Sequence, residues 1–353
     1  MHSLMWPSNW MEQTACWPLL LSGTILAALK SQRISKTMRR EKILHINHYS
    51  ADEIIQRLEA QGYFANKKIA YSVLNAIRPG GAPLLVEGDP GVGKTSLAKA
   101  VAQMLDIPLV RISCYEDITA DKILYDYDYQ RQLLVVSALR EKLNEQVKNM
   151  DLGESIQKIA GQAEFYGRDF LLDRPVLKAL TMPGRKVLLI DEIDKADTEI
   201  EHALLELLSD FAITIPEYGV IQCKEKDRPI VFLTSNNYRE LSQPMLRRCC
   251  YLYIEHKSYE EILAIITARV DASDEFRQRV AAGLEALQKT NLKHMVSISE
   301  GIEWARSLRT VFGCETAADI EGALPYAVGA LAKDRADEKK ILHTLKSVPA
   351  AGV

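Results

Sequence analysis

The sequence predicts an α/β fold in which helices flank a parallel sheet, followed by a small all-helical domain. Three observations predict it. An apolar stretch at residues 83–87 leads into a glycine-rich loop and then a segment with helical spacing, the strand–loop–helix order of an α/β unit. Residues 187–190 are a continuous apolar run, typical of a strand buried in a parallel sheet. From His256 onward the apolar residues recur at helical spacing.

The glycine-rich loop fits G-x-x-x-x-G-K-[ST], the phosphate-binding P-loop. Its glycines let the backbone turn N–H groups toward an anion, and the following helix aims its dipole at the same point. Lys94 is expected to reach the β- and γ-phosphates of a nucleotide, and the Thr95 hydroxyl to take a Mg²⁺ position. A chance match is disfavoured because both flanking segments agree. The predicted nucleotide-binding residues of the loop are Gly88, Asp89, Pro90, Gly91, Val92, Gly93, Lys94, Thr95 and Ser96.

The chain has 353 residues, enough for two domains, and its 47% hydrophobic and 26% charged content is that of a soluble globular protein. A net charge of −3 gives no basic footprint for nucleic acid. The six cysteines include no C-x-x-C pair, so the sequence predicts neither a zinc site nor a disulfide framework. We therefore expect reduced thiols and a cytoplasmic location.

Residues 1–48 are expected to be an extension outside the fold, either disordered or lying upstream of the true start. Three of the four tryptophans, Trp6, Trp10 and Trp17, fall here. The apolar run at residues 19–29 is shorter than the ~20 residues that a membrane-spanning helix needs. Basic residues follow this run, whereas in a signal peptide they precede it. A membrane anchor is the alternative interpretation of this apolar run, but we expect that the protein does not associate with a membrane.

The predicted elements up to residue 180 place a long insertion after the second strand. A capping-box pattern, S-x-x-E, opens a helix at residue 50. A second helix is expected over residues 67–77 and a strand over residues 107–113. Residues 114–129 are acidic and tyrosine-rich, which argues against contact with nucleic acid. Further helices are expected over residues 133–150, 154–163 and 174–180.

Two carboxylates follow the apolar strand at residues 187–190, in the pattern known as Walker B. A strand in a parallel sheet delivers the residues that follow it to the edge where α/β proteins bind ligands. Asp191 is therefore expected to hold Mg²⁺ together with Thr95, and to belong to the nucleotide site. Glu192 is expected to polarise the attacking water.

The segment after Walker B is expected to contain a helix, a hairpin and two strands. A second S/T-x-x-E pattern at residues 198–201 predicts a capping box that opens a helix. Residues 212–215 and 219–222 predict a hairpin. A strand over residues 229–235 ends at Asn236, which can orient water or, alternatively, serve as a turn residue. A last strand covers residues 250–254, and helices are expected over residues 258–270, 276–287 and 297–308, with one or two more over residues 317–345.

Together these motifs resemble those of AAA+ ATPases, and more closely the MoxR family, in particular the branch that accompanies maturation of carbon-monoxide-dehydrogenase-type molybdenum enzymes. The resemblance covers about residues 50–310. It implies an AAA+ P-loop NTPase core over residues 49–255 and a helical lid over residues 256–353. The stretches that carry it are residues 88–95, 114–116, 129–134, 190–197, 207–217, 233–237 and 246–249.

The resemblance also implies roles by position. Asn236 falls on sensor 1, and Arg248 falls on the arginine finger, with Arg247 as second choice. Relatives often begin the third lid helix with S-P-R, whose arginine is sensor 2. Here Ser299 stands at that position, and Arg306, further along the same helix, is the candidate substitute.

The predicted activity is Mg²⁺-dependent ATP hydrolysis at a subunit interface, with ATP and Mg²⁺ as ligands. The resemblance implies a homo-oligomeric ring, commonly of six subunits, that acts as a chaperone-like remodeller. It further implies a partner with a von Willebrand factor A domain and a client metalloenzyme that receives its metal or cofactor. The first alternative is a nucleic-acid motor or clamp-loader-like protein, which shares the R-R-C element at residues 247–249. The second is a small-molecule kinase with the same P-loop.

Overall fold

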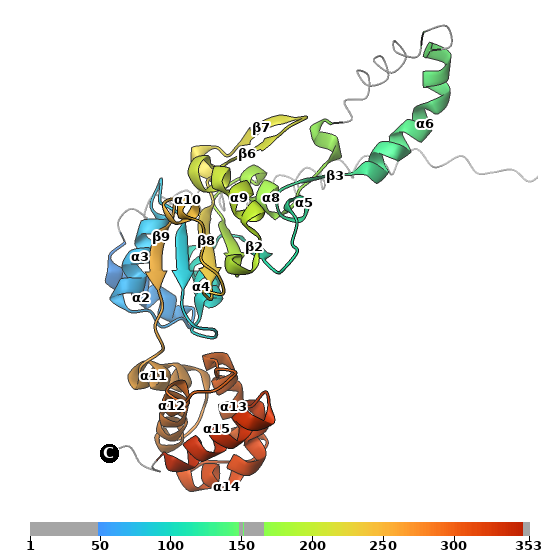
Figure 1. Ribbon diagram of the computed structural model, residues 1–353. Coiled ribbons are helices and arrows are strands. Elements are labelled where there is room, and N and C mark those ends of the chain that lie inside the picture. Colours follow the sequence, from blue (N-terminus) through green and yellow to red (C-terminus); the bar gives the residue numbers. More distant parts are fainter. Residues whose placement is uncertain (1–48, 148–150, 152–165, 349–353) are drawn as a thin grey trace, which may run out of the picture. The chain divides into compact units, whose positions relative to one another are not determined.

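The computed structural model describes residues 49–147, 151 and 166–348, and Figure 1 labels its helices and strands. The described residues from Ser50 onward belong to one compact unit. The predicted extension over residues 1–48 and the predicted helix over residues 154–163 lie outside the described residues. No helix in the described part of the chain is long and apolar enough to cross a membrane.

A five-stranded sheet carries the candidate site. Its strands follow the order β2-β5-β8-β1-β9, and each neighbouring pair is parallel. Every residue of β5 and β8 is buried, as expected for central strands covered on both faces. The predicted parallel sheet is therefore confirmed. The strands are β1 (Leu84–Glu87), β2 (Leu109–Ser113), β5 (Val187–Asp191), β8 (Ile230–Ser235) and β9 (Cys250–Tyr253).

Helices pack against this sheet (Figure 1). Helix α3 contacts β1, β8 and β9, α4 contacts β5 and β8, and α8 contacts β2. The predicted capping box at Ser50 is confirmed, because Ser50 and Glu53 exchange hydrogen bonds between side chain and backbone at 2.8 and 3.2 Å. The helices of this part are α2 (Ala51–Ala60), α3 (Lys67–Ile77), α4 (Lys94–Leu105), α8 (Pro175–Thr181), α9 (Thr198–Asp210) and α10 (Gln243–Leu246).

The insertion between β2 and β5 holds α5 (Ala120–Ile123), α6 (Tyr129–Val147) and α8, and its strands β3 (Asp126–Tyr127) and β4 (Leu171–Leu172) pair antiparallel. Helix α6 begins at Tyr129, earlier than the predicted start at residue 133, and the Asp128 carboxylate accepts the backbone N–H of Arg131 at 2.9 Å. The first turns of α6 expose Tyr129, Leu133 and Leu134, at 62%, 67% and 70%. A hairpin of β6 (Ala212–Ile215) and β7 (Gly219–Gln222) forms as predicted.

The predicted capping box at residues 198–201 is wrong. Helix α9 begins at Thr198, so its N-cap is Asp197 and not Thr198. Glu201 is fully buried, forms an ion pair with Arg239 and accepts the backbone N–H of Ser242 at 2.8 Å. The carboxylate therefore ties α9 to the segment after β8 instead of capping its own helix. Removing Arg239 would leave a buried charge unpaired, at a cost of roughly 3–5 kcal/mol in the free energy of unfolding.

From α11 onward the chain is helical, as predicted. Capping boxes begin α11 at Ser258, α13 at Ser297 and α14 at Thr316. The helices share their own hydrophobic core, in which the Trp304 side chain is fully buried. They are α11 (Tyr259–Arg269), α12 (Asp274–Gln288), α13 (Ile298–Thr310), α14 (Ala317–Ala327) and α15 (Arg335–Ser347).

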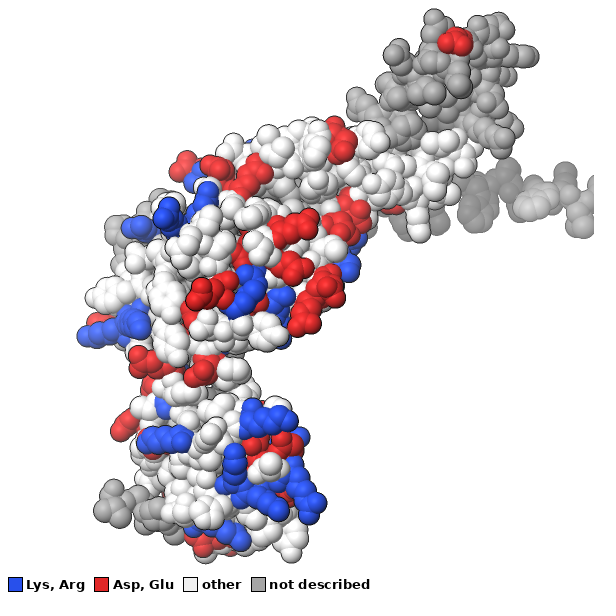
Figure 2. Space-filling view, in the orientation of Figure 1, with Lys and Arg blue, Asp and Glu red and all other residues white. Residues whose placement is uncertain are grey.

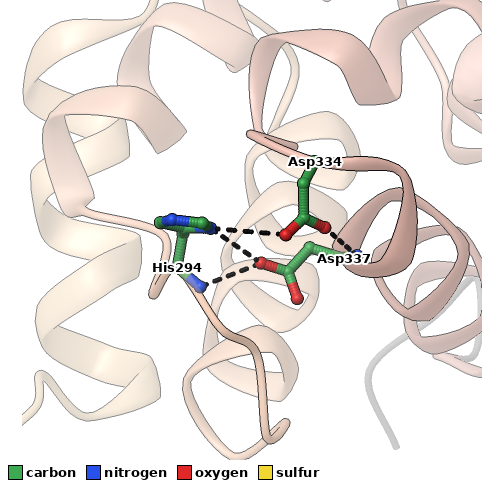
Figure 3. A group of neighbouring side chains, drawn as sticks. All are labelled: His294, Asp334 and Asp337. Atoms are coloured by element: carbon green, nitrogen blue, oxygen red, sulfur yellow. Dashed lines mark hydrogen bonds and ion pairs between the residues drawn. The ribbon is translucent and has the colours of Figure 1, made fainter.

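A loop-to-helix clasp made of His294, Asp334 and Asp337 holds the start of α15 (Figure 3). The Asp337 carboxylate accepts the backbone N–H groups of Lys293 and His294 at 2.9 and 2.8 Å. Asp334 caps α15 by accepting the Asp337 N–H at 2.8 Å. The imidazole Nδ1 lies 3.4 Å from Asp337 Oδ2. Both Asp337 oxygens already accept backbone N–H groups of the loop, and Asp337 lies in the first turn of α15, where a negative charge is favourable. We therefore interpret this trio as a structural clasp and not as a metal centre.

Replacing Asp337 with asparagine is expected to lower the Tm at neutral pH, because one of the two backbone N–H groups loses its acceptor. The backbone N–H of Lys293, followed by that of His294, holds the pKa of Asp337 below its ordinary value of 3.8. A depressed folded-state pKa stabilises the protein above the unfolded-state pKa, and this contribution is lost as the pH falls through the folded-state pKa. The Tm difference between parent and variant should therefore narrow on acidification from about pH 6 to about pH 3. A difference independent of pH would contradict this role.

Candidate nucleotide-binding site

The P-loop joins β1 to α4 at the carboxyl edge of the sheet. Two of its glycines are required by their conformation, and one of them, Gly91, also by lack of space. Gly91 has φ +85°, and a Cβ there would lie 2.5 Å from the Ser297 Cβ at the start of α13. Gly93 has φ +101° and adopts the left-handed conformation at the N-cap of α4. A side chain at either position would be strained, so the loop keeps its backbone N–H groups free to approach an anion.

Lys94 is buried under this loop. Its Nζ donates to the backbone oxygens of Gly88 and Asp89 at 2.6 and 2.9 Å. Burial lowers the pKa of Lys94 from 10.5, whereas nearby carboxylates, Asp194 foremost, act to raise it. The P-loop therefore presents a preplaced cation whose present partners are neutral carbonyl groups.

Asp191 and Thr95, predicted to act together, are brought into direct contact. The Thr95 hydroxyl donates to Asp191 Oδ1 at 2.7 Å, and the Thr234 hydroxyl donates to the same oxygen at 2.7 Å. Arg111 Nη2 and Nε donate to Asp191 Oδ2 at 2.5 and 3.1 Å. A threonine hydroxyl that donates its proton to a carboxylate keeps a lone pair for a metal. Hydroxyl and carboxylate oxygens are the hard ligands that Mg²⁺ prefers, so these two residues fit that ion.

Glu192 follows β5 in the left-handed conformation, with φ +58°. Its backbone N–H donates to the Thr234 hydroxyl at 2.8 Å. Its carboxylate accepts Lys195 Nζ at 2.9 Å and Asn236 Nδ2 at 3.3 Å. The hydrogen bond to Glu192 is the main cause that raises the pKa of Lys195. The predicted pair Glu192 and Asn236 is thus brought together by the ends of two neighbouring strands.

Asp194 fixes the tip of β8. Its Oδ2 accepts the backbone N–H groups of Asn236 and Tyr238 at 2.9 and 2.8 Å. No role in the site was predicted for Asp194, Thr234, Lys195 or Arg111. For two of them a signal is present, because Thr234 and Arg111 are polar residues within mostly apolar strands.

The two arginines before Cys249 lie apart from the P-loop. Arg248 Nη1 donates to the Pro244 carbonyl at 2.8 Å, and its Nε donates to the Ser209 hydroxyl on α9. The Arg247 side chain is exposed. None of the hydrogen bonds found among the described residues joins either arginine to the P-loop, Asp191 or Glu192 of the same chain.

The start of the third lid helix lies against the P-loop, through the approach of Ser297 to Gly91. Ser299, at the expected sensor-2 position, is exposed on the first turn of α13. Arg306, the candidate substitute, is exposed and pairs with Glu303 at 2.7 Å. A second link joins the P-loop to the segment before α11, since His256 Nε2 lies 2.8 Å from Asp89 Oδ2.

Known proteins share this core. Residues 83–249 match the family described as AAA domain (dynein-related subfamily). The chain is 25% identical over 236 residues to the Lon protease of Desulforamulus reducens, covering 64% of this chain and 23% of the protease. It is 24% identical over 234 residues to the Lon protease of Heliobacterium modesticaldum, covering 63% and 23%. This chain thus spans under a quarter of the length of these relatives. A solved structure of a RuvB mutant from Thermotoga maritima aligns with TM-score 0.40 and 19% identity, covering 84% of this chain and 73% of that chain.

Proposed function

We propose, from the premise that residues 83–249 form an AAA+ ATPase domain, that the protein hydrolyses ATP with Mg²⁺ and uses the energy for chaperone-like remodelling of a client enzyme. One observation carries the hydrolytic part. The carboxyl end of β5 holds two acidic side chains in different settings, Asp191 buried against Thr95 and Glu192 half-buried against Asn236. A buried carboxylate beside a hydroxyl suits a metal, and a more accessible one suits water activation.

In the proposed reaction the chain binds the nucleotide phosphates, holds Mg²⁺, and orients and polarises the attacking water. The backbone N–H groups of residues 89 and 91–94 and the Lys94 ammonium bind the phosphates, and Thr95 and Asp191 hold Mg²⁺. When bound, Mg²⁺ neutralises charge on the phosphate oxygens. The Glu192 carboxylate accepts a hydrogen bond from the attacking water and polarises it. Asn236 and Lys195 position that carboxylate, at the distances they hold now.

The proposed oligomer is a homo-oligomeric ring, expected to have six subunits, in which Arg248 acts on the nucleotide of its neighbour. The supporting observation is that Arg248 donates hydrogen bonds to Ser209 of α9 and to the Pro244 carbonyl, and that none found among the described residues joins it to its own P-loop. An arginine in trans needs a closed assembly in which each subunit completes the next site. We divide the subunit into an AAA+ core over residues 49–255 and a helical lid over residues 256–353, preceded by the extension over residues 1–48.

Arg248→Ala is expected to lower ATP hydrolysis by roughly 10³-fold, because an arginine finger neutralises charge that develops on the transferred phosphate. Mixing it with Glu192→Gln subunits, themselves inactive, should restore part of the activity. In such a mixture an intact Glu192 meets an intact Arg248 across some interfaces. Phosphate release from mixtures of stated ratio measures this, and Arg247→Ala is the matched control. Mixed rings that co-elute yet recover no activity would exclude Arg248 as the trans residue.

The proposed client is a metalloenzyme that receives its metal or cofactor, with a von Willebrand factor A-domain protein as adaptor and the cytoplasm as location. The support is the motif resemblance, together with the exposed apolar start of α6, which offers a surface for a partner. The test is retention of proteins from a lysate of the source organism on ATP-loaded Glu192→Gln protein, with Lys94→Ala as control. Retention of a metalloenzyme or such an adaptor by the first variant alone is expected. Equal retention by both variants would count against an ATP-driven client cycle.

The alternative function as a nucleic-acid motor has little support from the charges on the face of the molecule that Figure 2 shows. Acidic side chains alternate with lysines and arginines on the face shown in Figure 2, and the net charge is −3. A nucleic-acid motor gains much of its affinity from clustered basic residues. A mobility shift at low salt, with and without ATP, should show no complex.

A further inference from the structure

Arg111 lies within β2, whose residues 110–113 alternate between buried and exposed positions, and Arg111 takes an exposed one. In the register of β2 with β5, Arg111 lies opposite Leu189. Two residues further along, Ser113 lies opposite Asp191. Its guanidinium reaches along the sheet edge to Asp191 Oδ2, with Nη2 at 2.5 Å and Nε at 3.1 Å. The Arg111 side chain is 46% exposed, whereas that of Asp191 is 3% exposed.

The Asp191 carboxylate has no hydrogen-bonding capacity left. A carboxylate offers about four lone-pair sites. The Thr95 and Thr234 hydroxyls both donate to Oδ1, and the two Arg111 nitrogens both donate to Oδ2. A metal ion, or a water bound to it, can contact this carboxylate only if a present donor withdraws.

Arg111 is the donor best placed to withdraw. Thr234 is buried in β8 and also accepts the Glu192 N–H, so its position is fixed from two sides. Thr95 is fixed by helix α4 and is itself a proposed metal ligand. Arg111 is long and partly in water, and its hydrogen bonds among those described go to Asp191 alone.

We propose that Arg111 is a positioning residue that serves as the resident counterion of Asp191 and yields to a divalent cation only when nucleotide phosphates are present. The inference rests on the proposed function, since it gives Asp191 the role of metal ligand. A guanidinium on Asp191 Oδ2 both occupies the oxygen and repels a second cation. Phosphate groups offer the guanidinium another anionic partner and supply negative charge for the metal. The free protein is thereby kept from binding divalent cations before ATP arrives.

The test measures Mn²⁺ binding to the nucleotide-free full chain by electron paramagnetic resonance, with Mn²⁺ as the probe for Mg²⁺. Arg111→Gln and Arg111→Met both remove the charge and should tighten Mn²⁺ binding by roughly 10-fold. Arg111→Lys keeps a cation and should stay within about threefold of the parent. Arg174→Gln is the matched control, because Arg174 also pairs with an aspartate, Asp126 at 2.7 Å, outside the proposed site. Adding Asp191→Asn to the Arg111→Gln protein should abolish the gain.

Several outcomes would overturn the inference. Unchanged or weaker Mn²⁺ binding in both neutral variants would do so, as would a similar gain in the lysine variant or a gain that survives Asp191→Asn. Thermal melting identifies a variant that fails to fold, and the second neutral variant then decides. Failure of the proposed function is detected separately, as the parent protein's failure to bind a fluorescent ATP analogue in the presence of Mg²⁺.

Discussion

Glu192→Gln is expected to lower ATP hydrolysis by at least about 10²-fold and to leave ATP binding intact. Glutamine has nearly the same shape and keeps an amide oxygen that can accept the Asn236 hydrogen bond. It lacks the negative charge that polarises water, and it loses the ion pair with Lys195 Nζ, now at 2.9 Å. The residue lies half-exposed at the end of β5 and contributes nothing to the core, so the fold should persist.

Phosphate release and the fluorescence of a bound ATP analogue measure the two halves of this prediction. Glu199→Gln is the matched control, since Glu199 is an exposed glutamate on the first turn of α9. That variant should hydrolyse ATP at the parent rate. Hydrolysis at the parent rate by Glu192→Gln would instead show that another group activates the water.

Lys94→Ala is expected to weaken ATP binding by at least about 10²-fold. Lys94 Nζ now donates to the Gly88 and Asp89 carbonyls from a buried position, so it is already next to the loop that would hold the phosphates. Burial has removed most of the water around the ammonium group. A charge-assisted hydrogen bond from this group to a phosphate is therefore stronger than it would be in water. Without the ammonium, one of the positive charges that offset the four carboxylates acting on Lys94 would be lost, and the phosphates would meet a more negative site.

Equilibrium binding of a fluorescent nucleotide checks the lysine prediction. Lys99→Ala is the control, because Lys99 lies on the same helix with its side chain exposed. Its affinity should match that of the parent. If Lys94→Ala bound nucleotide as tightly as the Lys99 variant, the phosphates would have to lie elsewhere.

Local patterns predicted the parts of the fold that depend on residues near one another in sequence. The strand, loop and helix around Lys94, the hairpin at residues 212–222 and the capping box at Ser50 depend on neighbours within a few residues. The capping box at Thr198 failed for the opposite reason. Its glutamate, Glu201, has a stronger partner in Arg239, whose position depends on the tertiary fold and not on the helix.

A residue of the site could be predicted from the sequence only where it marks the end of a strand or helix. Asp191, Glu192 and Asn236 follow apolar strands, and parallel pairing places such strand ends together. The contacts of Arg111 and Asp194 could not be predicted in this way. Arg111 meets Asp191 across a separation of 80 residues, and Asp194 meets Asn236 across 42. Such pairings require the register between strands, which spacing along one segment does not contain.

The adjacency of β2 and β5 has a consequence for how this protein can diverge. The two strands pair from Leu109–Val187 to Ser113–Asp191, so the chain leaves the sheet at one strand and re-enters it at the next. Closing a loop twice as long costs only about 0.6 kcal/mol more. Segments of other lengths and sequences could therefore be grafted between β3 and β4, while α8 stays packed against β2 and Asp191 keeps its place. Mutation and recombination can reshape what lies between them while the sheet edge that carries Asp191 stays under separate constraint.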